Sequence, residues 1–126
     1  MSKRTVRLLT FAKLQASNAD RLPEFKNAKG ATAHKKSDGS DWTLLEWAGA
    51  MCGEAGEAAN VAKKLRRGDI HLVAGNPTGR KLLADEIADT VIYADLLATQ
   101  AGISLGDAVR EKFNETSKKV GSSVRL

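Results

Sequence analysis

The sequence predicts an all-α protein built as one domain over residues 1–126, and three observations support that prediction. Apolar residues recur at helical spacing in four segments, which are separated by glycine, proline or polar stretches. No strand-like alternation of useful length and no internal repeat is found. Of the 126 residues, 42% are hydrophobic and 28% are charged, which is ordinary for a folded soluble domain and unlike a disordered or membrane protein.

The N-terminal third is expected to hold one helix and one loop. The helix is predicted over about 5–20, before a proline that ends or redirects it. The next stretch, 26–41, is polar and contains glycine, which predicts a flexible loop.

A second helix is expected to start near Asp41 to Thr43 and to run to about Arg66. Thr43 is followed three residues later by Glu46, and this pair predicts a capping box at the helix start. Gly68 supplies the stop signal, because glycine readily adopts the left-handed conformation that ends helices.

The third helix is expected to start near 78–79 and to end before Gly102. Its residues are apolar on nearly every side, which predicts a buried helix. A fourth helix is predicted from Ser104, a suitable N-cap, to about Lys119. The residues 122–126 form a tail without a clear pattern.

Two pairs of acidic residues have the same helical spacing. Glu54 and Glu57 lie three residues apart, as do Glu86 and Asp89, so each pair shares one helix face. The 28 residues between Glu57 and Glu86 allow one helix to end and another to run back antiparallel. The two pairs are therefore expected to face each other across a helix–helix seam.

Four carboxylates in a partly buried seam would repel one another unless some are protonated or a cation neutralises them. Oxygen ligands without cysteine or histidine favour a hard ion, either Mg²⁺ or Mn²⁺. The alternative is that the acids face solvent and pair with Lys63, Lys64 or Arg80. The pattern of acids leaves both interpretations open.

The stretches "GEAGEAANVAKK" and "LADEIADTVIYADLLATQAGISLGDAVREKFNETSKKVG" resemble the MazG-like family of all-α nucleoside triphosphate pyrophosphohydrolases. The family hallmark is ExxE followed, after a variable gap, by ExxD. The resemblance covers about residues 42–121 and is closest to the small single-domain members, including those found in phages. It implies a four-helix bundle of antiparallel helices.

The resemblance also implies an activity, the hydrolysis of a (d)NTP to (d)NMP and pyrophosphate in nucleotide-pool control or cleaning. It implies Mg²⁺, with Mn²⁺ as a possible substitute, held by Glu54, Glu57, Glu86 and Asp89. Either Glu54 or Glu57 would act catalytically by orienting or deprotonating the attacking water. A homo-oligomer, dimer or tetramer, is implied as well, with sites built partly from a neighbouring subunit.

Five residues are candidates for substrate binding. The resemblance points to Lys112 and Asn114 on the last helix for phosphate or sugar contact, and to Tyr93 for lining the same pocket. Trp42 could stack on a nucleobase, although a place in the core or an interface is the more common role of tryptophan. Lys63 could reach a phosphate tail or could simply be solvated.

Other polar residues receive no functional role from the sequence. His34 lies in a polar loop and His71 in a connector, and neither has a partner at ligand spacing. The stretch "LQASNADR" matches the family only loosely. Its residues Gln15, Asn18 and Arg21 are therefore interpreted as a polar helix face rather than as contacts to a base.

The charge distribution suggests an alternative function. Residues 1–40 carry nine Lys or Arg and three acids, so the basic excess lies in the N-terminal third. A non-enzymatic helical dimer could bind nucleic acid through it, although a solvated face explains the charge equally well. A catalytically silent relative of the family is a third possibility.

Cys52 is the single cysteine, which fits a reducing, cytoplasmic location, and it is predicted to be buried. No membrane span and no signal peptide is expected.

Overall fold

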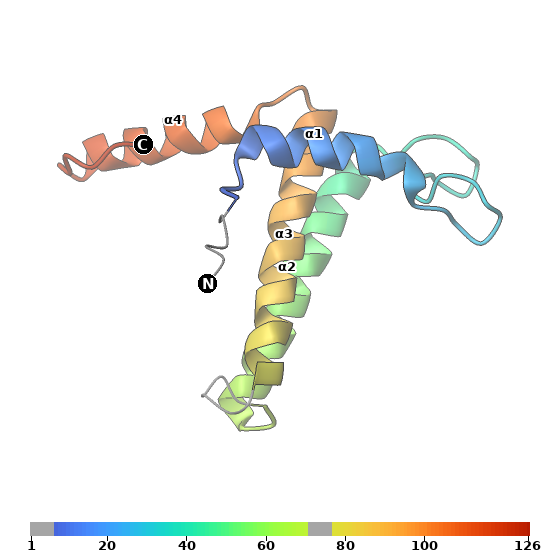
Figure 1. Ribbon diagram of the computed structural model, residues 1–126, viewed down its shortest axis with the longest axis horizontal. Coiled ribbons are helices and arrows are strands. Elements are labelled where there is room, and N and C mark those ends of the chain that lie inside the picture. The colour runs from blue at the N-terminus through green and yellow to red at the C-terminus, as the bar shows by residue number, and fades with distance from the viewer. Residues whose placement is uncertain (1–6, 71–76) are drawn as a thin grey trace, which may run out of the picture.

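The computed structural model describes residues 7–70 and 77–126. In these ranges the chain forms four α-helices and one short 3₁₀ turn, and the only bridges are two isolated ones, with no strand (Figure 1). The all-α prediction is therefore confirmed. No helix in the described part of the chain is long and apolar enough to cross a membrane. The elements are α1 (Phe11–Arg21), η1 (Leu22–Glu24), α2 (Leu44–Arg67), α3 (Pro77–Gln100) and α4 (Leu105–Lys119).

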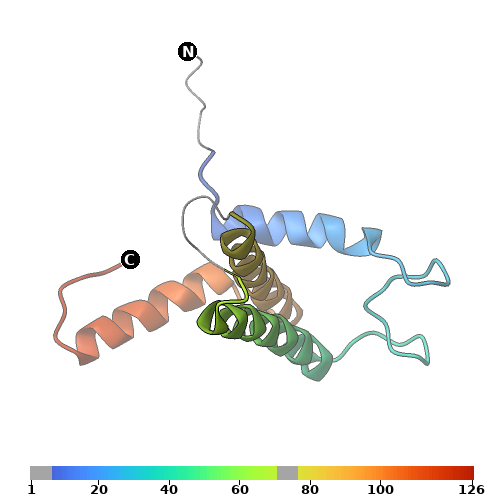
Figure 2. The same cartoon turned by 90° about the horizontal axis from the view of Figure 1, so that it is seen from below.

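The two long helices form the centre of the molecule. The helices α2 and α3 lie side by side, and the chain that descends along α2 in Figure 1 returns upward along α3. The shorter α1 lies across the upper end of this pair and packs on α3. The last helix, α4, extends away from the pair, as Figures 1 and 2 both show.

The helix ends follow local hydrogen-bonding rules. At the start of α2 the Thr43 backbone N–H donates to Glu46 Oε2 at 2.7 Å, which completes the predicted capping box. Gly68 ends α2 at φ 80°, in the left-handed region. Ser104 caps α4 by accepting from the Asp107 backbone N–H at 3.4 Å. These three boundary predictions are confirmed.

The start of the first helix differs from the prediction. Thr10 has an extended backbone and its side chain accepts from the Lys13 backbone N–H at 3.1 Å, so it is the N-cap of α1. The helix therefore begins at Phe11 and not near residue 5, because Thr10 is its cap and residues 7–9 before the cap are not helical.

The interior contains few apolar residues. In the described ranges the buried hydrophobic residues are Trp47, Val61, Leu96 and Ala98. The most buried large side chain is polar, since Asp95 is only 2% exposed. The single chain thus buries less apolar surface than a domain of its length usually does.

The prediction that the third helix is buried is wrong for one of its faces. Ile87 and Val91 lie one turn apart on α3 and are exposed, and Ile87 is 52% accessible. The reason is geometric, because α2 covers one side of α3 and α1 crosses only one end of it. An apolar face of α3 is left open to solvent.

The predicted flexible loop has a defined course. Isolated bridges join Lys26 to Thr32 and Lys35 to Asp41, so the segment 26–41 makes two successive narrow turns. Glycines with positive φ lie in both turns. The segment carries a buried histidine, His34, between the turns.

Two other predicted segments are the C-terminal tail and the connector between α2 and α3. The tail folds back on α4, where the Ser122 backbone N–H donates to the Ser117 carbonyl at 2.8 Å. The connector between α2 and α3, with His71, lies outside the described residues.

Trp47 is 3% exposed and joins α2 to the aromatic residues of the loop, so its truncation should leave a large void. We expect Trp47→Ala to lower the free energy of unfolding by about 3–5 kcal/mol. Urea unfolding at a fixed protein concentration measures this value. Asn60→Ala, at an exposed position of α2, should change it by less than about 0.5 kcal/mol. Equal effects of the two substitutions would show that Trp47 is not part of the core.

Candidate metal centre and adjoining cavity

Three glutamates from the two long helices form one cluster. Glu54 and Glu57 lie one turn apart on α2, and Glu86 lies on the neighbouring face of α3. One carboxylate oxygen from each lies within 4.8 Å of the others. Such a set of oxygen donors is the kind that a hard divalent ion prefers.

The cluster carries an unbalanced negative charge. Burial, followed by the charges of Asp89 and Glu57, raises the pKa of Glu54. Burial is also the first cause that raises the pKa of Glu86, followed by contact with the Glu57 carboxyl and by the charges of the neighbouring acids. Like charges that cannot separate favour the protonated form in this way.

No cation of the described residues compensates the cluster. The ion pairs in the described ranges do not include these acids, so the pairing with Lys63, Lys64 or Arg80 is not observed. One oxygen, Glu86 Oε2, is buried and has no hydrogen-bond partner among the described residues. An orphaned carboxylate oxygen among acids fits a site for a cation, since a buried acceptor without a partner is costly.

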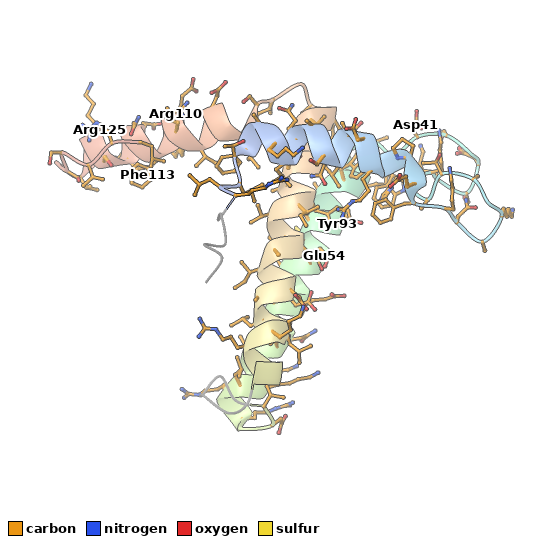
Figure 3. All side chains as sticks on the ribbon, viewed as in Figure 1. Asp41, Glu54, Tyr93, Arg110, Phe113 and Arg125 are labelled. Atoms are coloured by element: carbon orange, nitrogen blue, oxygen red, sulfur yellow. The ribbon has the colours of Figure 1, made fainter. Side chains whose placement is uncertain are left out.

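Asp89 lies one turn beyond Glu86 but outside the group of three. It forms part of the wall of a cavity of about 220 Å³, together with Glu54 and Tyr93. The same two acids, after burial, raise the pKa of the Tyr93 hydroxyl. Figure 3 shows Glu54 and Tyr93 on the central helix pair, below the crossing of α1. The cavity thus begins at the acid cluster.

The remaining walls of this cavity come from α1, η1, the loop and α3. Asn18 and Arg21 contribute from α1, and the loop contributes His34. The expectation that Asn18 lies on a polar outer face is wrong, because Asn18 is only 5% exposed. Gln15, one turn earlier, lines a different cavity between α1 and α4. The remaining lining residues are Leu22, Phe25, Ile92 and Leu96.

An aromatic cluster adjoins the cavity, and Phe25, His34 and Tyr93 of this cluster line it. The His34 ring stacks on Trp47, with 4.9 Å between centroids and 19° between planes. Trp42 meets His34 edge-on at 4.9 Å, and Phe25 does so at 5.5 Å. His34 Nε2 lies 3.5 Å from the Tyr93 hydroxyl, and burial lowers the pKa of His34. Sequence reasoning missed His34, and its only signal was a histidine between the aromatic residues at 25 and 42.

The predicted substrate-binding residues do not all come together. Tyr93 lines the cavity, and Trp42 packs against the cluster and lines an adjacent cavity of about 260 Å³. Lys63 is exposed on α2 and does not line the cavity beside the acids. Within one chain Lys112 and Asn114 lie on α4, which Figure 3 shows pointing away from Glu54 at the labelled positions Arg110 and Phe113. Lys112 pairs with Glu115 there, and Asn114 bonds the backbone of Leu126.

One exposed face of α2 carries the single cysteine and three glycines. Cys52 is exposed, so the prediction that it is buried is wrong. It lies with Gly49, Gly53 and Gly56 on a face of α2 where an added Cβ at each glycine would meet nothing within 4 Å. The glycines are therefore not required for the packing of α2 on α3.

The comparisons with known proteins assign no family. The chain matches no protein-family model and no curated protein sequence. The acid cluster and its cavity are therefore the basis for a functional proposal.

The raised pKa of Glu86 leads to a prediction about how the stability of the fold depends on pH. A carboxyl whose pKa is higher in the folded state stabilises the fold at low pH, and that contribution is lost as the pH rises through the folded pKa. In chelator, the melting temperature of the wild type should fall relative to that of Glu86→Gln as the pH rises from about 4 towards neutrality. Mg²⁺ at neutral pH should raise the melting temperature of the wild type and much less that of Glu86→Gln.

Asp85→Asn is the matched control, because Asp85 is exposed on the same helix and pairs with Lys81. It should keep the Mg²⁺ response. Parallel pH profiles for the wild type and Glu86→Gln, with no Mg²⁺ effect on either, would contradict the assignment of a cation site.

Proposed function

We propose that this protein is a Mg²⁺-dependent nucleoside triphosphate pyrophosphohydrolase that converts (d)NTP to (d)NMP and pyrophosphate, in nucleotide-pool control or cleaning. The observation that supports it most directly is the cluster of three glutamate carboxylates within 4.8 Å, at the mouth of a cavity of about 220 Å³. The resemblance of the ExxE and ExxD spacing to the MazG-like family points to the same chemistry. In that family the chains form bundles of antiparallel helices, which is the arrangement we propose for the assembled protein.

The four acids would have different roles according to their positions. Glu54, Glu57 and Glu86 would hold the ion, with Asp89 one turn away on the cavity side. A bound divalent ion supplies positive charge that neutralises phosphate oxygens and lowers the pKa of a bound water. Either Glu54 or Glu57 would orient the attacking water or accept its proton. The water oxygen joins one phosphate as the α–β anhydride bond breaks, and pyrophosphate leaves.

The cavity suits the nucleoside end of the substrate. Its lining includes the rings of Phe25, His34 and Tyr93 as well as the carboxylates of Glu54 and Asp89. A planar base packs well between rings, and a triphosphate extending towards the acids would reach the ion. The Tyr93 hydroxyl lies 3.5 Å from His34 Nε2, and after burial the charges of Glu54 and Asp89 raise its pKa. Trp42 would act by supporting His34 rather than by direct stacking on the base.

We further propose that the working unit is a homo-oligomer. A compact monomer of 13.5 kDa exposes about 6,500 Å², whereas this chain exposes 9582 Å². The excess of about 3,000 Å² per chain exceeds the roughly 800 Å² that one partner contributes to a standard-size interface. The open apolar face of α3 and the glycine face of α2 are the surfaces available for a second copy.

An oligomer would also explain the position of α4. The helix packs on α1 and α3 only near its start and otherwise extends from its own chain. Its exposed Lys112 is then available to the acid cluster of a neighbouring copy, where it would add a cation to Arg21, which lines the cavity beside the acids of its own chain. Asn114 would contribute in the same way once it releases the tail.

The activity is tested by pyrophosphate release from a panel of canonical and modified NTPs and dNTPs. We expect turnover with Mg²⁺, none with chelator, and a loss of at least about 100-fold in Glu57→Gln and Glu86→Gln. Asp85→Asn, with the exposed acid next to Glu86 replaced, should retain the wild-type rate. Absence of turnover on every nucleotide, with Mg²⁺ and with Mn²⁺, would refute the proposal.

The oligomer is tested by light scattering after size exclusion. We expect the wild type to be at least a dimer and Val91→Glu to dissociate, because a charge would be buried in the interface. Ala16→Glu places the same charge at an exposed position of α1 and should leave the mass unchanged. A monomeric wild type at micromolar concentration would contradict this part of the proposal.

A further inference from the structure

One side chain anchors the loop 26–41 to the helices. Of the residues 26–41, all of which the structure describes, only His34 is buried. In the described part of the chain, the hydrogen-bond contact from this loop to a helix joins His34 Nε2 and the Tyr93 hydroxyl at 3.5 Å. The backbone hydrogen bonds of the loop lie within it or reach Phe25 just before it. The rest of the loop projects beyond the helices, as Figures 1 and 2 both show.

The place that receives the His34 ring is apolar. The ring lies against Trp47, Trp42 and Phe25, with 4.9–5.5 Å between ring centroids. Its Nδ1 atom is buried and has no hydrogen-bond partner among the described residues. The loop is thus anchored by a polar ring that has one unpaired nitrogen.

The hydrogen-bonding capacity of imidazole makes this place selective for the neutral ring. A neutral imidazole has one N–H donor and one acceptor nitrogen, so one of them can pair with the Tyr93 hydroxyl while the other stays unpaired. An imidazolium has two N–H donors and a positive charge. In this position, one of its donors would be a charged group buried without an acceptor, which is much more costly.

The charged groups around the ring do not supply the missing partner. The charged residues that line the two cavities beside the ring are Arg21 of α1, Glu54 of α2, Asp89 of α3, and Lys35 and Asp41 of the loop. Lys35 and Asp41 pair with each other. After burial, the charges of Glu54 and Asp89 raise the pKa of Tyr93, whereas burial alone lowers the pKa of His34.

The same ring contributes to the walls of two cavities. His34 lines the cavity of about 220 Å³ beside the acids and the cavity of about 260 Å³ beside Trp42. Withdrawal of His34 with its loop would therefore open a wall of each cavity.

We propose that His34 is a pH-sensitive latch, which holds the loop 26–41 on the helices while the ring is neutral and releases the loop when the ring is protonated. The latch makes access to both cavities dependent on pH. It does not depend on the identity of the ligand and is therefore independent of the proposed function.

The sign and the size of the effect follow from proton linkage. In the released loop the ring is solvated and has its ordinary pKa of about 6.5, whereas burial lowers the pKa in the docked loop. The released form therefore binds more protons, and docking weakens as the pH falls through about 6.5. If the docked ring stays neutral, the equilibrium constant for release rises about 10-fold between about pH 7.5 and pH 5.5.

Hydrogen exchange measures the release directly. The Ala33 backbone N–H donates to the Phe25 carbonyl at 2.9 Å and lies next to His34, so its exchange reports opening of the loop. After correction for the intrinsic pH dependence of exchange, its protection in the wild type should fall about 10-fold between about pH 7.5 and pH 5.5. A proton NMR titration of the His34 ring should give a pKa below about 6.5.

The variants assign the response to one ring. His34→Phe keeps an aromatic side chain in the apolar place and should show no such change in protection, and His34→Gln, which is also unable to titrate, serves if the phenylalanine variant does not fold. The carboxylates of the acid cluster are unchanged in both variants, so any effect of their titration remains and is subtracted. His71→Gln removes the other histidine of the chain and should keep the 10-fold change.

Three results would overturn the latch: equal protection of the Ala33 amide at both pH values in the wild type, the same fall in protection in the folded His34 variants, or a His34 pKa at or above about 6.5. None of these measurements uses a nucleotide. Failure of the latch would therefore leave pyrophosphate release unaffected, and absence of pyrophosphate release would leave the latch unaffected.

Discussion

The packing of α2 on α3 is the constraint on which the rest of the structure depends. It holds the carboxylates of Glu54, Glu57 and Glu86 together, although their charges favour separation. Burial first, and the charges of the neighbouring acids after it, raise the pKa of Glu54 and of Glu86. Apolar contacts between the helices offset the repulsion in the metal-free protein, and a cation would remove it. The strain at the candidate site thus lies in the charges that the packing brings together and not in the backbone.

The cavity exists because two other segments are placed on this pair. The Asn18–Asp95 hydrogen bond ties α1 to α3 in a buried position, where a broken polar pair is costly. The loop 26–41 then turns back so that His34 stacks on Trp47. With these contacts Glu54 and Asp89 line a cavity that also contains aromatic rings and the polar side chains of Asn18 and Arg21. Without α1 and the loop they would lie on an open helix surface.

The single chain leaves much of its apolar surface uncovered. Ile87 and Val91 on α3, and Phe113 on the extended α4, are exposed, while few apolar residues are fully buried. Within one chain, the extended α4 also keeps Lys112 away from the acid cluster. A second copy would account for both observations, because it would cover α3 and could bring Lys112 to the acids. We therefore regard assembly and catalysis as linked parts of one proposal.

The sequence by itself determined the helical class, the capping box at Thr43, the stops and starts at Gly68 and Ser104, and the placement of acids three residues apart. These features depend on local spacing and local hydrogen bonds, which the order of residues states directly. Only the tertiary structure decided which side chains surround the acids. Asn18 and Asp95 are 77 positions apart, and His34 and Tyr93 are 59 apart, so no periodicity relates them. The predicted burial of α3 is wrong for one face for the same reason. An apolar pattern indicates that a helix face is normally covered, but it does not indicate whether the covering surface belongs to the same chain.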